Sequence, residues 1–391
     1  MPDARDARHP VIVWLESEGR SILQPAAFLD AFAARLRASG VEVARITTGV
    51  PTLHPQLFSW SGLWELERGA SERYYRDDRD SDAKLQNSPI NIAYEGRGPV
   101  RCNPRLSPEP GEFGILADLR SMGMTDYLVL PVPFSDGSHK ALSLATRRPG
   151  GFSDADIALF AAAMPAFAAI LEVQALRRTT RTLLDTYVGR EAAQRVLAGQ
   201  IRRGMGETIR AAIWLCDIRG FTALTESLPR DTLLAMLDQF FGTMCDAVEA
   251  HGGEVLKFMG DAMLAIFPFS GGDKMEACRL ALAAAREAEQ SLARINAGRG
   301  ADDETAIAYG IALHVGEVIY GNIGGESRLD FTVIGPAVNL AARIEAMCRQ
   351  LGRTLVLSAD FVAVGAIDAE PLGEFSLRGV AVPQRLYAPR A

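Results

Sequence analysis

The chain lacks paired cysteines, an excess of positive charge and a long uncharged apolar run. Its 5 cysteines are scattered without a CxxC pair, so neither a disulfide framework nor a zinc site is indicated. The formal net charge of −7 argues against a nucleic-acid-binding protein, which would usually carry a basic face. The longest uncharged apolar stretch, Ile157 to Leu171, falls short of the roughly 20 residues that span a membrane and indicates a buried helix. Since the first residues also lack the apolar run of a signal peptide, we expect a reduced, cytoplasmic protein without a membrane span.

The length of the chain indicates more than one domain. At 391 residues it exceeds one ordinary domain, and we place an N-terminal domain at 1–155, a connecting helix and linker at 156–205, and a C-terminal domain at 206–391. The connecting segment has apolar residues at mostly helical spacing, and Pro165 should kink or interrupt it. This segment either pairs with the same helix of a second chain or packs on its own domain.

The N-terminal domain shows helix and strand patterns at its two ends. A helical pattern runs from Pro25 to Ala38, two strand-like runs span Tyr127 to Val132 and Ala141 to Thr146, and a long helix starts near Asp154. The segment DYLVLPVPFSDGSHKALSLATRRPGGFSDADIALF resembles the closing strands and helix of a GAF-like sensor domain. That resemblance implies an α/β domain that responds to a small-molecule or protein signal, which the sequence does not name.

Aromatic residues gather in the middle of the N-terminal domain. Trp60, Trp64, Tyr74 and Tyr75, with His54 nearby, either line a small-molecule pocket or belong to the core of an α/β domain. The core interpretation is favoured, because large aromatic side chains are more often buried for packing than for ligand binding.

The C-terminal domain has a clear alternation of strands and helices. The order strand, helix, strand, strand, helix, strand is that of an α/β (α+β) ferredoxin-like βαββαβ domain, a sheet with helices on one face. The expected strands are Ala211–Cys216, Glu254–Phe258, Ala262–Pro268 and Ala306–Val315, and the expected helices are introduced by Ser227 and Pro229 and by Lys274.

Two aspartates each follow a predicted strand, Asp217 in WLCDIRGFT and Asp261 in LKFMGDAMLAIF. A single aspartate at such a position is more often a turn residue, but two of them flanking a βαββ unit would form an oxygen-rich site suited to Mg²⁺ or Mn²⁺. No GxxxxGK[ST] P-loop occurs in the chain. Backbone N–H groups of Gly220, Phe221 and Thr222, at the following helical start, could instead cradle a triphosphate.

The C-terminal half resembles the class III nucleotidyl cyclase family. The resemblance rests on CDIRGFT, KFMGDAMLAIF, GIALHVGEVIYGNIG, FTVIGPAVNLAARIE and LGEFSLRGVAVPQRLYA, which stand in the family's order. It implies that Asp217 and Asp261, with the carbonyl of Ile218, hold two divalent metal ions per active site. It also implies that Asn339 positions the ribose and that Arg343, one helical turn later, stabilises the transition state.

The same resemblance assigns the base to Lys257 and Thr332. It implies an adenylate cyclase that converts ATP to 3′,5′-cyclic AMP, since Lys donates to N1 of adenine and cannot accept from N1–H of guanine. Thr332 stands where Asp is commoner, and a hydroxyl both donates and accepts, so discrimination against GTP is expected to be softer. Enzymes with Thr at this place form a subgroup of which some members resemble bicarbonate-stimulated cyclases, so bicarbonate sensitivity is a further hypothesis.

The family resemblance also implies a homodimer. The metal aspartates come from one protomer and the adenine and transition-state residues from the other, so two active sites would lie across the interface. We further expect the N-terminal domain to regulate how the two catalytic domains meet. A guanylate cyclase and a non-catalytic nucleotide-binding or dimerisation module remain the alternatives.

Overall fold

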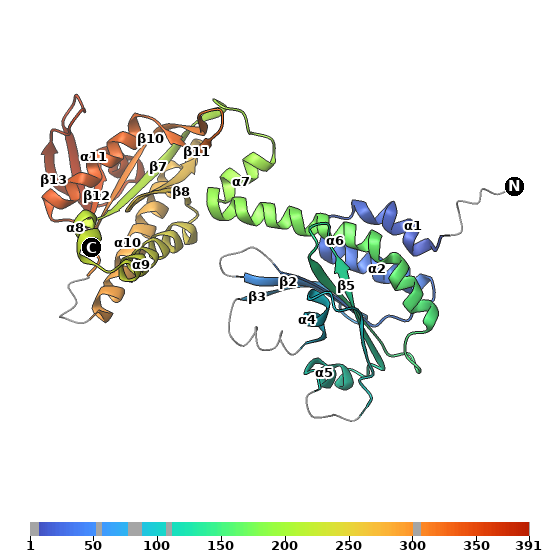
Figure 1. The fold of residues 1–391 in the computed structure, drawn as a ribbon. Coiled ribbons are helices and arrows are strands. Elements are labelled where there is room, and N and C mark those ends of the chain that lie inside the picture. The colour runs from blue at the N-terminus through green and yellow to red at the C-terminus, as the bar shows by residue number, and fades with distance from the viewer. Residues whose placement is uncertain (1–7, 52–56, 77–87, 107–111, 300–305, 391) are drawn as a thin grey trace. The chain divides into compact units, whose positions relative to one another are not determined.

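The computed structural model describes residues 8–51, 57–76, 88–106, 112–299 and 306–390. The chain divides into two compact units, Met1–Leu183 and Leu184–Ala391 (Figure 1). Each unit has a sheet of its own, so the two are described separately. His54, one of the residues considered for a small-molecule pocket, lies outside the described residues.

The N-terminal unit is built on a six-stranded sheet with the order β3-β2-β1-β6-β5-β4. All of its neighbouring strands are antiparallel. The strands are β1 (Arg45–Pro51), β2 (Leu57–Glu65), β3 (Gly69–Arg76), β4 (Val100–Cys102), β5 (Asp126–Pro133) and β6 (His139–Thr146). The helices are α1 (Pro10–Glu16), α2 (Pro25–Ala38), α4 (Pro89–Tyr94), α5 (Ile115–Ser121) and the first part of α6 (Asp154–Val188), with a short 3₁₀ turn at Gly19–Ser21.

Helices cover both faces of this sheet. The larger core joins α1, α2 and α6 to one face, and a smaller core joins α4 and α5 to the other. Trp60 and Trp64 are buried in the larger core, whereas Tyr74 and Tyr75 are exposed. The two tryptophans are therefore core residues, as the favoured interpretation of the sequence predicts.

Helix α6 is continuous from Asp154 to Val188 and contains Pro165. Of the two predicted effects of Pro165, a kink or an interruption, the interruption is therefore wrong, and the kink stays a prediction. Proline removes one backbone hydrogen bond, but the side chains of Met164 and Phe167 on either side are buried in the core and hold the helix in place. Among the described helices, α6 is the one with the length and hydropathy of a candidate membrane span, and 50% of that apolar window is buried inside the protein. Ile157–Leu171 is thus largely a core segment.

The C-terminal unit is built on an eight-stranded sheet with the order β13-β14-β12-β10-β7-β9-β8, and β11 pairs with β10. The strands are β7 (Gly206–Ile218), β8 (Glu254–Met259), β9 (Ala262–Phe269), β10 (Tyr309–Gly324), β11 (Leu329–Ile334), β12 (Leu355–Ser358), β13 (Ala369–Phe375) and β14 (Gln384–Pro389). The helices are α7 (Arg190–Leu197), α8 (Phe221–Ser227), α9 (Arg230–Ala250), α10 (Lys274–Gly298), α11 (Pro336–Leu351) and α12 (Ala359–Gly365), with a 3₁₀ turn at Gly271–Asp273.

Strand β7 is the centre of this unit, because both of its faces are buried. Its even-numbered residues Ala212, Trp214 and Cys216 belong to a core formed with α9 and α10. Its odd-numbered residues Ala211, Ile213 and Leu215 belong to a second core that includes Ala341 of α11. A strand that is buried on both faces has apolar residues at consecutive positions, whereas a strand with one exposed face alternates apolar and polar residues.

The sequence pattern predicted helices on one face of the C-terminal sheet, and this is wrong. Helices α9 and α10 lie on the expected face, but α11 and α7 contribute to the core on the other. The reason is that both faces of β7 are apolar, so each must pack against other elements to be buried from water. Helix α11 supplies Ala337 and Ala341, whose small side chains permit close packing on the sheet.

Candidate active site

The two aspartates predicted to hold metal are brought together by the sheet. Asp217 is the penultimate residue of β7, and its ladder partner on β9 is Ala262, the residue after Asp261. The backbone N–H of Ile218 donates to the carbonyl of Asp261 at 3.3 Å. Gly260, in the turn between β8 and β9, has a φ of +70°, a conformation that favours glycine. The tight turn therefore fixes Asp261 beside the end of β7.

The environment of Asp217 disfavours its ionised form. Burial raises the pKa of Asp217 to about 7, and the hydrogen bond with Asp261 and the negative charges of Asp261 and Glu345 add to the shift. One carboxylate oxygen, Oδ1 of Asp217, is buried and has no hydrogen-bond partner. A divalent cation would neutralise the pair and satisfy this oxygen, so the residues present fit such an ion.

Two carboxylates and a backbone carbonyl do not make a complete cage. In the part of the chain that the structure describes, no group of three or more His, Cys, Asp or Glu side chains is placed to hold a metal ion. Magnesium commonly keeps waters and substrate phosphates as its other ligands. An open set of protein ligands is therefore compatible with a metal that is shared with a nucleotide.

Glu345 and Arg219 lie near the aspartates, and the sequence did not indicate either of them. Burial raises the pKa of Glu345, Arg219 opposes the shift, and Asp261 adds to it. Arg219 follows Ile218 directly, donates to the carbonyl of Arg353, and leaves its buried Nε without a partner. Glu345 comes from α11, the helix of Asn339 and Arg343, but no spacing in the sequence shows that this one side chain turns toward Asp217 and Asp261.

Gly220, Phe221 and Thr222 form the start of α8, immediately after β7. Gly220 caps this helix with a φ of +71°, and its carbonyl accepts from the backbone N–H of Leu224. Phe221 is half-buried against the α9 and α10 core, whereas Thr222 is exposed. The segment therefore leaves the end of β7 as a sharp turn whose first helical residues begin beside Asp217.

Lys257 contacts a residue that the sequence interpretation did not name. The Nζ of Lys257, on β8, donates to Oδ2 of Asp330, on β11, at 2.9 Å. Thr332 is 3% exposed, and its Oγ1 has no hydrogen-bond partner. Asp330 and Thr332 are two residues apart on one strand and so lie on the same face, a period-2 relation that could have identified Asp330 from the sequence.

Asn339 and Arg343 lie on α11 and are both exposed. They are four residues apart, so their side chains occupy the same side of the helix. Within the described residues of this chain, neither side chain hydrogen-bonds or forms an ion pair with Asp217 or Asp261. Among the described residues, the catalytic pair predicted from the sequence is therefore not joined to the predicted metal pair by a hydrogen bond or an ion pair within one protomer.

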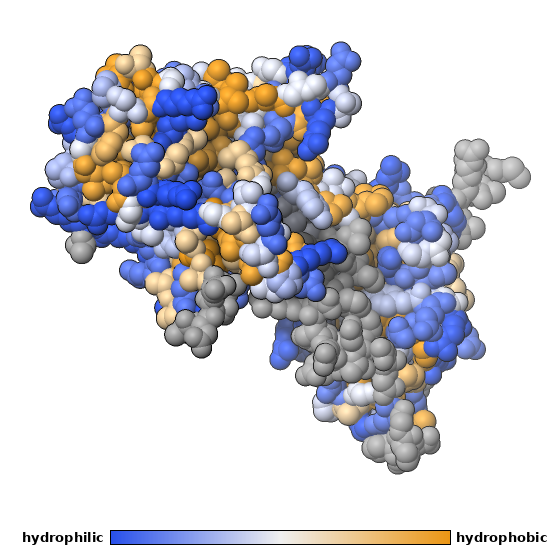
Figure 2. Space-filling view, turned by 60° about the vertical axis from the view of Figure 1, so that its left-hand side comes forward, coloured by the Kyte–Doolittle hydropathy of each residue, from blue (hydrophilic) through white to orange (hydrophobic). Residues whose placement is uncertain are grey.

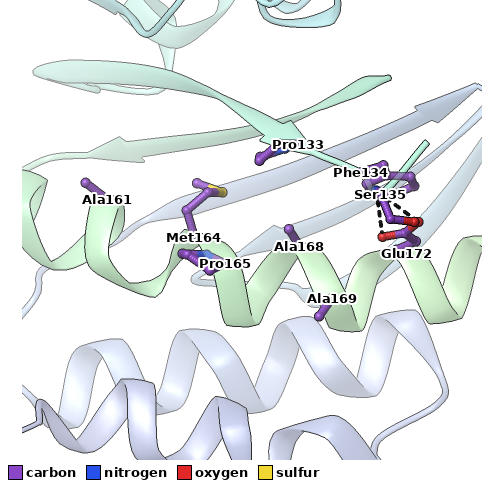
Figure 3. A pocket seen from close by; sticks show the side chains of 9 residues that line it. All are labelled: Pro133, Phe134, Ser135, Ala161, Met164, Pro165, Ala168, Ala169 and Glu172. Atoms are coloured by element: carbon purple, nitrogen blue, oxygen red, sulfur yellow. Dashed lines mark hydrogen bonds between the residues drawn. The ribbon is translucent and has the colours of Figure 1, made fainter. Parts of the chain in front are cut away.

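A groove in the N-terminal unit contains none of these residues. It measures about 470 Å³ and lies between the end of β5 and α6 (Figure 3). Its wall is mainly apolar, with Met164 and Pro165 on α6, and its one carboxylate, Glu172, already accepts from the backbone N–H and hydroxyl of Ser135. With its carboxylate already paired, the groove offers no catalytic constellation.

Comparison with known proteins gives the identity of the C-terminal unit. Residues 205–387 match the family model described as the adenylate and guanylate cyclase catalytic domain. Those residues are a cyclase catalytic domain. The cyclase domain contains every residue predicted to bind metal or nucleotide, while the match does not extend to the N-terminal unit.

Curated relatives resemble the same region. An adenylate cyclase from Anabaena cylindrica is 35% identical over 166 residues, which are 41% of this chain and 32% of that protein. An uncharacterized protein of Mycobacterium tuberculosis is 33% identical over 218 residues, 54% of this chain and 39% of its own length. The chain thus spans only about a third of the length of the curated relatives it matches.

Solved structures also resemble the cyclase domain. A bacterial light-regulated adenylyl cyclase is 29% identical, with 47% of this chain and 91% of that chain covered and a TM-score of 0.42. The guanylyl cyclase Cya2 is 28% identical, with 46% and 92% covered and a TM-score of 0.41.

Proposed function

We propose that the protein is an adenylate cyclase that converts ATP to 3′,5′-cyclic AMP and pyrophosphate. The observation that carries this proposal is the meeting of Asp217 and Asp261 at the end of β7, with one buried carboxylate oxygen unpaired, inside a domain that matches the cyclase family. In the reaction, the ribose 3′-oxygen forms a bond to the α-phosphorus as the bond from that phosphorus to the bridging oxygen breaks. The hydroxyl proton is released to solvent, and pyrophosphate leaves.

Different residues of the chain would bind the metal ions, the triphosphate and the ribose and stabilise the transition state. Asp217 and Asp261 would hold two Mg²⁺ or Mn²⁺ ions, which when bound lower the pKa of the 3′-hydroxyl and stabilise the leaving group. The backbone N–H groups of Gly220, Phe221 and Thr222 would bind the triphosphate. Asn339 would orient the ribose, and Arg343 would stabilise the negative charge that grows on the α-phosphate oxygens.

Base recognition is the part of the proposal that separates ATP from GTP. Lys257 would donate to N1 of adenine, an acceptor that guanine replaces by an N–H donor. The unpartnered hydroxyl of Thr332 would accept from the 6-amino group of adenine, although it could also donate to the 6-carbonyl of guanine. We therefore propose a preference for ATP that is not absolute.

A homodimer with shared sites accounts for the separation of the two residue pairs. The exposed positions of Asn339 and Arg343 would meet the aspartates of a second copy, not those of their own chain. Large apolar side chains are also exposed on three strands of this unit, namely Phe258 and Met259 on β8, Ile319 on β10 and Ile334 on β11. Hydrophobic side chains reach the surface of this unit between hydrophilic ones (Figure 2). A partner chain would cover them.

The direct test is the product formed from each nucleotide. Purified protein with Mn²⁺ is expected to turn ATP into cyclic AMP and pyrophosphate, identified by chromatography and mass spectrometry, and to use GTP more slowly. A larger cyclic GMP signal would favour guanylate cyclase. Formation of neither product, with nucleotide binding intact, would favour a non-catalytic module.

The N-terminal unit is proposed to regulate the cyclase domain through α6. Near the end of this unit, Arg178 of α6 is held by three side chains of the sheet. Its guanidinium pairs with Glu72 at 3.0 Å and stacks over the rings of Trp60 and Tyr74 at 4.8 and 4.9 Å. These contacts tie α6 to β2 and β3 at Arg178, before the last turns of the helix, which ends at Val188. A change in the sheet would act on the helix at this point.

Replacing Arg178 by alanine is expected to change the basal cyclase rate by at least about fivefold, the lower end of typical coupling between sites. The measurement is the initial rate at saturating ATP, alongside a thermal unfolding scan to verify folding. Arg177→Ala is the matched control, because Arg177 is exposed on the neighbouring position of α6. Equal rates in the two folded variants would remove the support for this route of regulation.

A further inference from the structure

Three buried polar atoms in the N-terminal sheet have no hydrogen-bond partner among the described residues. They are Nε of Arg45 and Oγ1 of Thr47, on β1, and Oγ of Ser61, on β2. Ser61 is 6% exposed, and the side chain of Arg45 is 11% exposed. A buried polar group without a partner destabilises a fold, and such groups are rare in native proteins unless water, an ion or a ligand satisfies them. Three of them on two neighbouring strands therefore indicate that something binds there.

The strand register places the three side chains on the same face of the sheet. Thr47 follows Arg45 by two residues on β1, and Ser61 pairs with Gly49, the next residue of that face. Ile46, between them, belongs to the larger core on the other face. The smaller core, on the same face as the three polar side chains, takes its described strand residues from β5 and β6 and none from β1, β2 or β3. The three polar side chains thus lie outside the apolar core of their face.

Arg45 has only a loose ion-pair partner among the described residues. Its Nε lies 3.8 Å from Oε1 of Glu65, too far for a hydrogen bond, and Oε2 of Glu65 accepts from Arg68 at 3.4 Å. Burial lowers the pKa of Arg45, Tyr127 and Glu65 oppose this shift, and Arg73 adds to it. The guanidinium stays protonated all the same. One carboxylate shared by two arginines, with a third nearby, leaves positive charge on this face, which a buried water would not neutralise.

Further polar groups border the three unpartnered atoms. A Cβ at Gly49 would lie 2.5 Å from the hydroxyl oxygen of Tyr94, which belongs to α4, so glycine at this position makes room for that hydroxyl beside Ser61. Burial raises the pKa of Tyr94, so its hydroxyl is neutral and can donate. Arg73 and Tyr75 lie on the same face of the edge strand β3 and are exposed. A ligand can therefore approach from that edge.

We propose that this face of β1 and β2 binds a small molecule that carries a carboxylate or phosphate group. Arg45 would pair with the oxyanion, and the hydroxyls of Thr47 and Ser61 would donate to its oxygens. Guanidinium and hydroxyl donors together suit an anion with several acceptor oxygens. Such a molecule would supply the small-molecule signal expected for the N-terminal unit, and the site itself does not depend on cyclase activity.

A ligand site and a purely structural role predict opposite effects on stability. Thr47→Val keeps the shape of the side chain and removes a hydroxyl without a partner, so the unfolding temperature of the ligand-free protein should rise by about 2–4 °C. If an ordered water bridges this hydroxyl to the fold, the temperature should fall, which would count against the proposal. Thr48→Val is the matched control, because Thr48 is buried on the opposite face of the same strand. Intrinsic fluorescence reports mainly on this unit, since Trp14, Trp60 and Trp64 are three of the four tryptophans.

The binding experiment uses four probes on the full chain in metal-free buffer, namely inorganic phosphate, phenyl phosphate, acetate and benzoate. Each is compared with potassium chloride at equal ionic strength. At least one probe is expected to raise the unfolding temperature in a saturable way. Arg45→Met should abolish this response, and Thr47→Val and Ser61→Ala should each weaken binding about tenfold or more in calorimetry. Arg35→Met, which removes an exposed arginine of α2, should bind like the wild type.

The pattern of responses identifies the ligand class. A response to the phosphates alone or to the carboxylates alone supports the site and names its chemistry. No saturable response to any probe, or an equal response in Arg45→Met, would overturn the inference. If Arg45→Met does not fold, equal binding by Thr47→Val and Thr48→Val overturns it instead. None of these results requires turnover, so a protein that forms no cyclic product would reject the cyclase proposal and leave this one standing.

Discussion

Asp217→Asn is expected to lower the turnover of ATP by about a thousandfold or more. Asparagine keeps the size of the side chain but removes the charge that would hold a divalent ion, and metal ions supply several kcal/mol of transition-state stabilisation. The measurement is the initial rate of cyclic AMP formation with Mn²⁺ at saturating ATP. Asp238→Asn is the control, because Asp238 is exposed on α9 and is not among the residues proposed to bind metal or nucleotide. A loss of less than about tenfold would contradict the assignment of Asp217 to the metal.

The role of Asp217 can also be tested from the pH dependence of Mn²⁺ binding, without measuring turnover. Since burial and Asp261 raise the pKa of Asp217 to about 7, a cation that binds below that pH must displace a proton. The affinity for Mn²⁺ should therefore increase as the pH rises from about 5 to 7 and level off above. Calorimetry in buffers of different ionisation enthalpy should detect proton release at pH 6 and almost none at pH 8. Asp217→Asn should abolish this release, and persistence of the release would show that another group carries the proton.

The protonation state of Asp217 should also affect the stability of the metal-free protein. This stability is expected to fall as the pH rises, whereas the affinity for Mn²⁺ increases. In the unfolded chain an aspartate titrates near about 3.9, so between pH 4 and 7 the folded state binds more protons than the unfolded state. The contribution of Asp217 to stability is thus fully present below the pKa of the unfolded chain and is lost as the pH rises through the folded pKa of about 7. Saturating Mn²⁺ should reverse that loss at pH 8. Only part of the shift becomes stability, because Asp217 is not fully buried.

The position of Asp217 and Asp261 in the fold was predictable, because the local sequence pattern determines it. A glycine turn after an apolar strand, MGD, fixed Asp261, and the βαββ order made the ends of β7 and the hairpin neighbours. The lengths of β7 and β10 were not predictable from hydrophobicity. Both strands continue through polar residues such as Arg210 and Glu317, which are partners in the ladder. Backbone pairing, not side-chain pattern, determines where such strands end.

Contacts between segments that are far apart in the sequence explain why Asp330 and Glu345 were not predicted as residues near the site. Lys257 and Asp330 meet because β8 and β11 approach each other in the folded unit. The period-2 relation to Thr332 places Asp330 on the same strand face, but it does not show that Asp330 pairs with Lys257. Glu345 is near Asp217 because α11 packs on the second face of the sheet, which the βαββαβ order does not include. The secondary structure at the start of the N-terminal unit was also not predictable, because the run VIVWL, Val11 to Leu15, is compatible with a strand or a helix. It becomes α1 with His9 as its cap and Pro10 at its first position.

Arg343→Ala is expected to lower kcat by about 10²–10³ and to change KM for ATP by less than about threefold. A cation that acts on charge developing in the transition state contributes to turnover and not to ground-state binding. Steady-state kinetics with ATP measure both constants. Arg349→Ala, an exposed arginine in the last turn of the same helix, is the control for loss of a positive charge on α11. A KM that rises as much as kcat falls would assign Arg343 to triphosphate binding instead.

Mixing Asp217→Ala with Arg343→Ala is expected to restore activity that neither variant has alone. If each site takes its aspartates from one chain and its arginine from the other, a heterodimer has one intact site and one that lacks both groups. Random pairing of equal amounts makes about half of the dimers mixed, so activity should approach about a quarter of the wild-type value. Subunit exchange is verified by co-purification of two differently tagged chains. Mixed dimers without recovered activity would mean that each chain completes its own site, and the exposed positions of Asn339 and Arg343 would then require a movement of α11 within one protomer.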